Sequence, residues 1–336
     1  MTALGPEQAS FVTSAGFAAE GWKALPADAS PRRYFRKSVG GQANALLMVT
    51  EPDAPDTLAY LDIARHLSAL GFSAPHILAD RADLGFVLVE DFGDATFTHL
   101  LDQGADETAL YEQAIDVLAA LHSHSCALQI GLPAYDMAPL LDEITLFADW
   151  FVPAYFPNVD AADFRQQFTA LWRDALHSVA QRREALVLRD FHVDNLMILK
   201  QHSGIARCGL LDFQDGLIGA AAYDVASLTQ DARRDVSGEL ETRLLDRYMA
   251  QRGPMDRAQF MADFHLLAAQ RHTKIAGIFV RLCQRDGKPR YLDHLPRVLR
   301  LLDAALTQAN LSPISDFMAA ALPDWPNAAL AKVSPK

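Results

Sequence analysis

Residues 185–215 read ALVLRDFHVDNLMILKQHSGIARCGLLDFQD, and this stretch decides the fold. It contains three apolar runs separated by polar breaks, at residues 186–188, 196–199 and 208–211. The first run ends in Asp190, Asn195 follows at the spacing D-x-x-x-x-N, and the third run ends in Asp212. Short apolar runs bounded by turn signals are typical of buried strands. The pattern predicts strand, turn and strand, with two carboxylates and an amide at the strand ends.

Phosphoryl transfer requires this arrangement, because a carboxylate must orient the acceptor hydroxyl and oxygen ligands must hold magnesium beside it. The stretch resembles the kinase catalytic loop, H-R-D-x-x-x-x-N followed by D-F-G. Leu188 stands where that loop has histidine, and Gln214 where it has glycine. These departures point away from protein kinases and towards the aminoglycoside phosphotransferase and choline kinase superfamily. The alternative is that these polar residues only cap turns, and the strand context favours catalysis.

Composition narrows the class of protein. The 336 residues are half hydrophobic and about a fifth charged, as in a globular protein of one large or two medium domains. A formal net charge of −12 argues against a nucleic-acid binder. The three widely spaced cysteines form no CxxC pair and fit a reducing compartment. We find no signal peptide and no bilayer-spanning run. The expectation is a cytoplasmic protein with no membrane, no nucleic acid and no evident obligate protein partner.

The first ninety residues carry the pattern of a nucleotide-binding lobe. A helix is expected at 6–16, and two strands at 34–39 and 45–50, joined by a turn at Gly40-Gly41. In a kinase fold this hairpin lies over the phosphates of ATP. Three arginines bring positive charge to it, and guanidinium groups match phosphate oxygens. We therefore predict that Arg32, Arg33 and Arg36 contact phosphate. The alternative is that they are solvated surface arginines.

The second of these strands lacks the lysine that kinases place there, and Met48 occupies about that position. The following helix, predicted at 57–70, correspondingly offers no obvious glutamate partner. A further strand ends at the polar break that starts with Glu90. In a two-lobed kinase this break is the hinge that pairs with adenine through backbone groups. By position, Glu90 and Phe92 are predicted to contact the nucleotide.

From residue 96 onwards the pattern is helical. A long helix is predicted at 260–284, with three cations at helical spacing on one side. This basic face is a candidate for binding a carboxylate or phosphate, although a solvated face paired with acids is the alternative. The candidate acceptor residues are Asp215, Arg271, Lys274 and Arg281. We interpret Asp224 as a helix N-cap and His122 as a core histidine.

Seven phrases together are similar to the anomeric N-acetylmuramate/N-acetylglucosamine kinases of bacterial cell-wall recycling, within the aminoglycoside phosphotransferase superfamily. The similarity runs from about residue 30 to residue 302. The phrases are SPRRYFR (30–36), VEDFGD (89–94), LRDFHVDNLM (188–197), LLDFQDGLIG (210–219), YDVASL (223–228), RHTKIAGIFVRL (271–282) and RDGKPRYL (285–292).

The resemblance implies an α+β, two-lobed, protein-kinase-like fold. A small antiparallel β-sheet lobe would occupy residues 1–92 and bind nucleotide, and a larger, mainly helical lobe would occupy residues 93–336. It implies an ATP- and Mg²⁺-dependent kinase that phosphorylates the anomeric hydroxyl of an N-acetylated amino sugar to the sugar 1-phosphate. By motif, Asp190 orients the hydroxyl and accepts its proton, and Asn195 and Asp212 hold Mg²⁺.

Two other functions stay open on the sequence. One is a kinase for a different small acceptor, such as an aminoglycoside or choline. The other is a nucleotide-binding pseudokinase. The missing lysine at Met48 favours it, and the presence of Asp190, Asn195 and Asp212 argues against it. The sequence leaves undetermined the sugar preference, the anomer, the acceptor residues, the oligomeric state, the nucleotide and the cation that replaces the lysine.

Overall fold

The computed structural model describes residues 4–26, 32–37 and 45–330. The chain divides into two compact units. The first comprises Met1–Ala120, His124–Ile130 and Asp190–Gly216, and the second comprises Leu121–Ser123, Gly131–Arg189 and Leu217–Lys336.

These units do not coincide with the expected lobes 1–92 and 93–336. The reason is hydrogen bonding between the catalytic segment and the earlier part of the chain. The amide of Leu210 donates to the carbonyl of Ser73 at 2.8 Å, and the amide of Ile198 donates to the carbonyl of Ala95 at 3.0 Å. Residues 190–216 therefore fold with the first unit.

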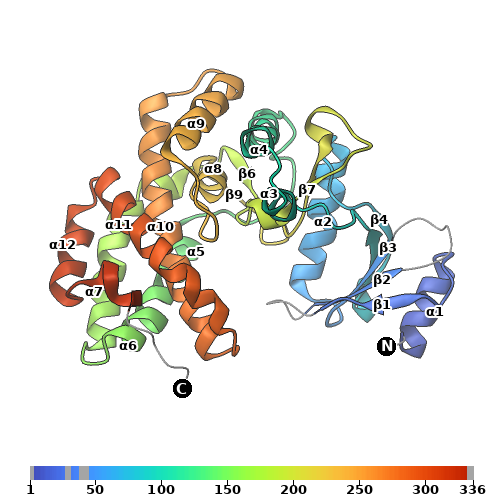
Figure 1. The fold of residues 1–336 in the computed structure, drawn as a ribbon, viewed down its shortest axis with the longest axis horizontal. Coiled ribbons are helices and arrows are strands. Elements are labelled where there is room, and N and C mark those ends of the chain that lie inside the picture. Colours follow the sequence, from blue (N-terminus) through green and yellow to red (C-terminus); the bar gives the residue numbers. More distant parts are fainter. Residues whose placement is uncertain (1–3, 27–31, 38–44, 331–336) are drawn as a thin grey trace. The chain divides into compact units, whose positions relative to one another are not determined.

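The first unit is built on a five-stranded antiparallel sheet in the order β1-β2-β3-β5-β4 (Figure 1). Its strands are β1 (Trp22–Ala24), β2 (Arg33–Lys37), β3 (Ala45–Val49), β4 (Ile77–Arg81) and β5 (Phe86–Glu90). Strands β2, β3 and β5 confirm the predicted strands to within a few residues. Strand β1 was not predicted, because three residues are too few to show an alternating pattern. The predicted turn at Gly40-Gly41 lies outside the described residues.

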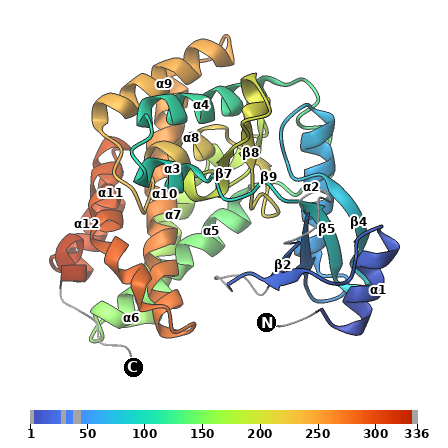
Figure 2. The same ribbon diagram turned by 45° about the vertical axis from the view of Figure 1, so that its right-hand side comes forward.

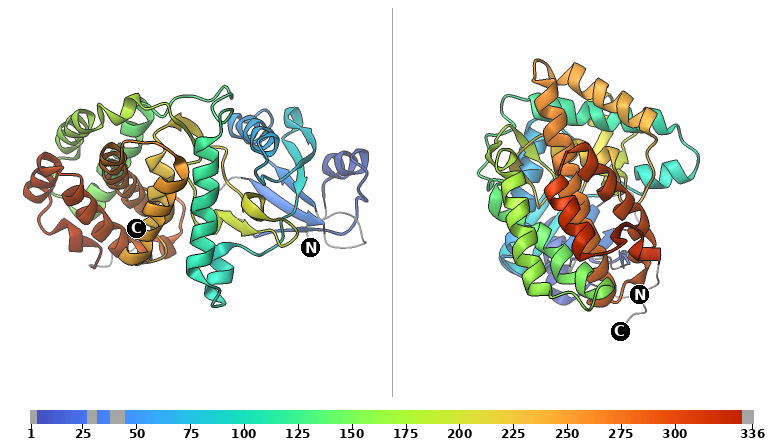
Figure 3. Two further views of the ribbon diagram at one scale, coloured as in Figure 1. Left: turned by 90° about the horizontal axis from the view of Figure 1, so that it is seen from above. Right: turned by 90° about the vertical axis from the view of Figure 1, so that its left-hand side faces the viewer.

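The two faces of this sheet are covered by different helices. Helix α1 (Pro6–Ser14) packs Phe11 and Val12 against one face, where Phe35, Leu47 and Leu88 are buried. Figure 3 shows α2 (Pro55–Ala69) on the other side of the sheet from α1. Because side chains alternate along a strand, residues at even and odd positions of β2 serve different faces.

The remaining elements of the first unit follow in the chain. They are the short 3-10 turn η1 (Ala82–Leu84), helix α3 (Phe97–Asp102), most of α4 (Glu107–Ser123), the turn η4 (Val193–Asn195), strand β7 (Leu196–Ile198), the turn η5 (Gly204–Arg207) and strand β8 (Cys208–Leu210). Strands β7 and β8 pair antiparallel, as the sequence predicted.

The second unit is mainly helical. Its elements are α5 (Met137–Leu146), the π-turn η2 (Phe147–Phe151), α6 (Val152–Tyr155), α7 (Ala161–Leu176), η3 (Val179–Gln181), β6 (Ala185–Val187), β9 (Leu217–Gly219), α8 (Ala222–Thr229), α9 (Gly238–Arg252), α10 (Arg257–Gln284), η6 (Pro289–His294), α11 (Leu295–Gln308), α12 (Ser312–Ala321) and η7 (Trp325–Leu330). The 28-residue α10 packs against α5, α8 and α11 (Figure 2). Within the described residues, no helix is long and apolar enough to span a membrane. The predicted α+β fold, a small antiparallel sheet with a mainly helical remainder, is confirmed.

Candidate active site

The three residues predicted for catalysis lie together in the first unit. The side-chain amide of Asn195 donates to the backbone carbonyl of Asp190 at 2.9 Å, and its nitrogen lies 3.4 Å from Oδ2 of Asp212. The amide of Leu211 donates to the carbonyl of Asn195 at 2.9 Å, which ties β7 to the end of β8. The D-x-x-x-x-N spacing followed by Asp212 therefore brings two carboxylates and an amide to one place.

Asp212 occupies an unusual backbone and electrostatic setting. Its φ of 57° lies in the left-handed region, which non-glycine residues adopt rarely and often at functional sites. Its side chain keeps 48% of its surface exposed. The surrounding protein atoms nevertheless desolvate the carboxylate and raise its pKa, and the nearby charge of Asp190 raises it further. A cation bound here would relieve both effects.

These residues fit Mg²⁺. Asp212 and Asn195 offer the carboxylate and amide oxygens that this hard cation prefers. Gln214 donates to Oδ1 of Asp212 at 2.9 Å and so holds the carboxylate in place. Among the residues that the structure describes, no group of three or more acidic, histidine or cysteine side chains forms a closed metal site. Two protein ligands suit a Mg²⁺ that is completed by substrate phosphates and water.

The three arginines predicted for phosphate binding have different surroundings. Arg32 lies with its Nη1 4.0 Å from Oδ1 of Asp212, and Arg33 is exposed. Arg36 instead pairs with Asp91 at 2.7 Å and with Asp94 at 2.6 Å. Its guanidinium fixes the segment after β5 to strand β2, and its positive charge is already paired with two carboxylates.

The predicted hinge residues lie at the end of β5. The amide of Glu90 donates to the carbonyl of His76 at 2.9 Å and is thus used within the sheet. The ring of Phe92 lies against Gly209 of β8, where a Cβ atom would come within 2.9 Å of it. Phe92 thus has a packing role that explains a glycine at position 209.

The residue before Asp190 is anchored by the second unit. Arg189 has a φ of 68°, again in the left-handed region. The buried carboxylate of Asp224 accepts the amides of Leu188 at 2.6 Å and Arg189 at 2.8 Å, and the hydroxyl of Ser227 donates to the carbonyl of Arg189 at 3.2 Å. Asp224 lies inside the first turn of α8, so the predicted N-cap is wrong. Its structural role is to hold the chain leading into Asp190.

A buried carboxylate organises the side chain of Arg189. Glu143 on α5 accepts hydrogen bonds from Tyr135 at 2.5 Å, Lys274 at 2.7 Å and Gln270 at 2.8 Å, and it also pairs with the Arg189 guanidinium. Burial opposes ionisation of this carboxyl, but Lys274 and Arg189 outweigh it and lower the pKa of Glu143 to about 2. Glu143 is therefore ionised at neutral pH.

This arrangement corrects the interpretation of the basic face on α10. Lys274 is buried and paired with Glu143, so its charge is already used within the protein. Arg271 is only 3% exposed. Burial lowers the pKa of Arg281, and the neighbouring charge of Arg285 lowers it further. The face is neither solvated nor open to a ligand at Lys274 and Arg271. Asp215 lies in the other unit, 3.4 Å from the amide nitrogen of Gln214.

A sequence model of the phosphotransferase enzyme family matches residues 21–262. The chain belongs to this family. As a phosphotransferase it is an enzyme, and its relatives are similar over most of their length. An N-acetylmuramate/N-acetylglucosamine kinase of Caulobacter vibrioides is 34% identical, with 91% of this chain and 93% of the relative covered. An enzyme of the same name from Pseudomonas aeruginosa is 35% identical, with 87% and 88% covered.

Solved structures of other phosphotransferases share the fold. The aminoglycoside phosphotransferase APH(2")-IIa, in a ternary complex with streptomycin and ATP, matches with a TM-score of 0.61 at 14% identity. The match covers 88% of this chain and 97% of that one. An ethanolamine kinase of Plasmodium vivax matches with a TM-score of 0.57 at 13% identity, covering 85% and 82%. At these identities the likeness establishes the protein-kinase-like fold.

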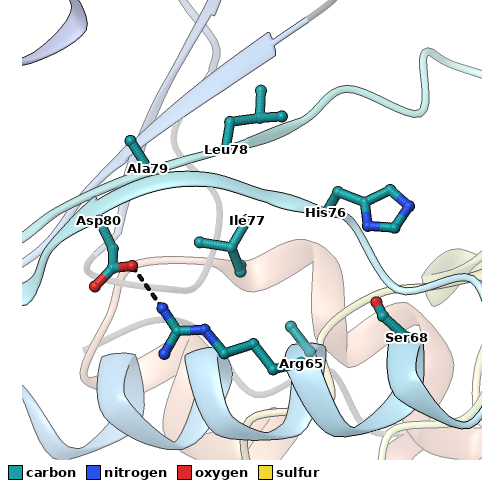
Figure 4. Close-up of a pocket in the computed structure, with 8 residues that line it drawn as sticks. Arg65, Ser68, His76, Ile77, Leu78, Ala79 and Asp80 are labelled. Carbon is teal, nitrogen blue, oxygen red and sulfur yellow. Dashed lines mark hydrogen bonds and ion pairs between the residues drawn. The ribbon is translucent and has the colours of Figure 1, made fainter. Parts of the chain in front are cut away.

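A groove of about 320 Å³ lies between α2 and β4 of this phosphotransferase (Figure 4). It is bordered by an ion pair of 2.5 Å between Arg65 and Asp80, and by His76, Ser68 and Leu78. None of its lining residues is among the predicted site residues. The groove shares Ser68 and His76 with a neighbouring pocket that Glu90 and Phe92 also line.

Proposed function

We propose that this phosphotransferase is an ATP-dependent kinase that phosphorylates the anomeric hydroxyl of N-acetylmuramate or N-acetylglucosamine, giving the sugar 1-phosphate. The observation that carries the proposal is the name shared by relatives that are similar over most of the chain. The grouping of Asp190, Asn195 and Asp212 supports it, because it provides a base and two metal ligands. Such a product fits recycling of cell-wall amino sugars, and a kinase that uses ATP would act in the cytoplasm.

In this mechanism the chain's own residues position the reactants. Asp190 accepts a hydrogen bond from the anomeric hydroxyl, aims its oxygen at the γ-phosphorus and takes its proton as the new O–P bond forms and the bond from the γ-phosphorus to the bridging oxygen breaks, which releases ADP. An anomeric hydroxyl is more acidic than an ordinary alcohol, so a carboxylate is an adequate base. Asn195 and Asp212 would hold Mg²⁺, which neutralises charge on the phosphates. Glu90 and Phe92 would contact adenine through backbone groups.

Phosphorus NMR of the protein with MgATP tests the proposal. N-acetylmuramate, N-acetylglucosamine, kanamycin and choline are supplied in separate tubes. We expect a new phosphate signal, split by the anomeric proton, with one or both sugars, and none after EDTA removes the metal. Product with kanamycin or choline only would overturn the proposed acceptor and retain the fold and catalytic residues.

The role of Asp190 is tested by Asp190→Asn, which keeps the side chain's size and removes its basicity. We expect transfer to be lost while the dissociation constant for MgATP stays close to that of the wild type, measured by calorimetry. Loss of a general base and of its orienting charge costs at least about a hundredfold in rate. Activity that survives this substitution would refute the assignment of Asp190 as the base.

A further inference from the structure

Position 48 on β3 is where kinases carry the lysine that contacts the ATP phosphates. Here it is Met48, whose side chain is fully buried. The hydroxyl of Tyr34 lies 3.4 Å from its sulfur, and the two residues are paired across strands β2 and β3. The usual cation is thus replaced by an apolar contact, and a different residue must face the phosphates if the enzyme is a kinase.

Strand alternation identifies which arginine shares the face of Met48. Tyr34 lies opposite Met48, and Arg32, which directly precedes β2, is hydrogen-bonded to the side chain of Tyr34 and therefore lies on the same side of the sheet. Arg33 pairs with Val49, which belongs to the core cluster under α1 on the opposite side. Arg33 is exposed and lines a small pocket together with Arg32, and Arg32 also lies beside Asp212.

The side chain of Arg32 is held beside the metal-ligand candidate. Only 9% of it is exposed, and its Nη1 lies 4.0 Å from Asp212. Its guanidinium also donates a hydrogen bond to the hydroxyl of Tyr34. Helix α2 contributes Tyr60 to this group, with its ring stacked on Phe213 at 5.1 Å and an interplanar angle of 9°. The aromatic pair fixes the residue that follows Asp212.

We infer that Arg32 supplies the phosphate-directed positive charge that the lysine on β3 supplies in other kinases. This inference rests on the proposed function to the extent that Asp212 binds the metal of a nucleotide. A guanidinium at this place stays charged at any physiological pH and presents two parallel N–H groups to phosphate oxygens. Because it lies near Asp212, it reaches phosphates that share a metal with that carboxylate.

The assignment also explains why α2 needs no glutamate. In kinases with a lysine on β3, a carboxylate on the following helix orients the flexible ammonium. Here the cation is Arg32, which directly precedes β2, and Tyr34 and Asp212 orient it instead. The absence of the lysine on β3 thus also accounts for the absence of the glutamate on α2. The same observation weighs against a pseudokinase, because the site keeps a cation beside Asp212.

Binding measurements on the full chain test this inference without an acceptor. We expect Arg32→Met to weaken MgATP binding by about tenfold or more, as for loss of a charged hydrogen bond, while adenosine binding stays unchanged. Arg81→Met on β4 is the control, because it removes the same charge from an exposed arginine that pairs with Asp83, and it should change MgATP binding by less than about twofold. Equal MgATP affinity of Arg32→Met and wild type, or an equal loss in both variants, would overturn the inference.

A relocated charge provides a second test, in which both proteins that are compared carry Arg32→Met. The double variant Arg32→Met/Met48→Lys returns a cation to the same face of the sheet from β3. We expect it to bind MgATP more tightly than Arg32→Met, with adenosine affinity equal in the two proteins. A double variant no better than the single one would overturn the equivalence of the two positions. A wild type that binds MgATP but phosphorylates neither sugar would refute the proposed acceptor and leave both tests of Arg32 intact.

Discussion

Glu143 is a single buried carboxylate on which two cations, Lys274 and Arg189, converge. The substitution Glu143→Gln keeps the side chain's size and removes the charge, which leaves two cations facing each other in a site with little access to water. We expect the free energy of unfolding to fall by about 3–5 kcal/mol, as for the breaking of a buried ion pair, in urea unfolding near neutral pH. Because Arg189 is bonded to Asp190, we also expect kcat to fall more than the KM for ATP rises.

The double variant Glu143→Gln/Lys274→Met is the control for this charge argument. It removes one of the two uncompensated cations, so it should recover part of the lost free energy of unfolding. The contribution of Glu143 also has a defined pH window. Its pKa is about 2 in the folded protein against 4.5 ordinarily, so its stabilisation is present above about pH 4.5 and is lost as pH falls towards 2. A double variant less stable than Glu143→Gln would contradict the argument.

Among individual site residues, the sequence predicts those that lie close to one another along the chain. Asp190, Asn195 and Asp212 were found because they lie at the ends of neighbouring apolar runs. Glu143 was missed because its partners Arg189 and Lys274 are 46 and 131 residues away in the chain. An acidic residue in an amphipathic helix gives no sign of being buried until the partners are known.

Among the elements, helix α10 depends on one glycine for its close approach to α5. A Cβ atom on Gly277 would lie 2.3 Å from the carbonyl carbon and oxygen of Leu146 and 2.6 Å from the amide of Phe147. These atoms belong to backbone and cannot rotate away. We expect Gly277→Ala to lower the free energy of unfolding by about 2 kcal/mol or more, although alanine favours helices, because overpacking of a core typically costs about 1–3 kcal/mol.

The same substitution at Gly238 is the matched control. Gly238 is the first residue of α9, and a Cβ atom there meets nothing within 4 Å. Gly238→Ala should leave the midpoint of urea unfolding unchanged or raise it slightly, since alanine gains up to about 1 kcal/mol over glycine in a helix. If Gly277→Ala behaved like Gly238→Ala, the close contact between α10 and the end of α5 would not constrain the packing.

Helix α10 also shows how far periodicity carries a prediction. The helix predicted at 260–284 is present from Arg257 to Gln284. Two cations of the predicted basic face, Arg271 and Lys274, are buried, and the pattern did not show this because spacing places side chains on a face but does not say whether that face meets solvent. Most of α10 is buried against neighbouring helices on several sides, and Lys274 finds its counter-charge on α5. The burial of Lys274 and its pairing with Glu143 result from packing between helices that are distant in the sequence.

Over the whole molecule, the net charge of −12 did not forecast where individual charges are used. Arg32 remains beside Asp212, whereas Arg36 and Lys274 are paired with nearby carboxylates. Composition therefore gives a total charge but does not tell which cations lie beside the candidate metal ligands and which lie elsewhere in the structure. The division into two units could not be predicted from the sequence either. Residues 190–216 belong to the first unit because of hydrogen bonds to residues distant in the chain.

Stability of the molecule as a function of pH depends on a buried histidine, His272 on α10. Its Nε2 lies 2.9 Å from the amide oxygen of Gln230, and it is fully buried. Burial, and to a smaller extent the charge of Arg271, together lower the pKa of His272 from 6.5 to about 3. Above about pH 6.5 the imidazole is neutral in both folded and unfolded chains. Below it the unfolded chain alone takes up the proton, so folding loses about 1.4 kcal/mol per pH unit until pH approaches 3.

The substitution His272→Gln isolates this term, because glutamine can still donate to Gln230 and does not titrate. Other groups titrate alike in both proteins, so they cancel in the difference between the two free energies of unfolding. We expect wild type to lose about 2.7 kcal/mol relative to His272→Gln when pH is lowered by about two units from 6.5. Urea unfolding followed by tryptophan fluorescence reports this, since Trp150, Trp172 and Trp325 lie in the same unit as His272. A difference that stays constant over this range would mean that His272 takes up its proton in the folded protein as readily as in the unfolded one.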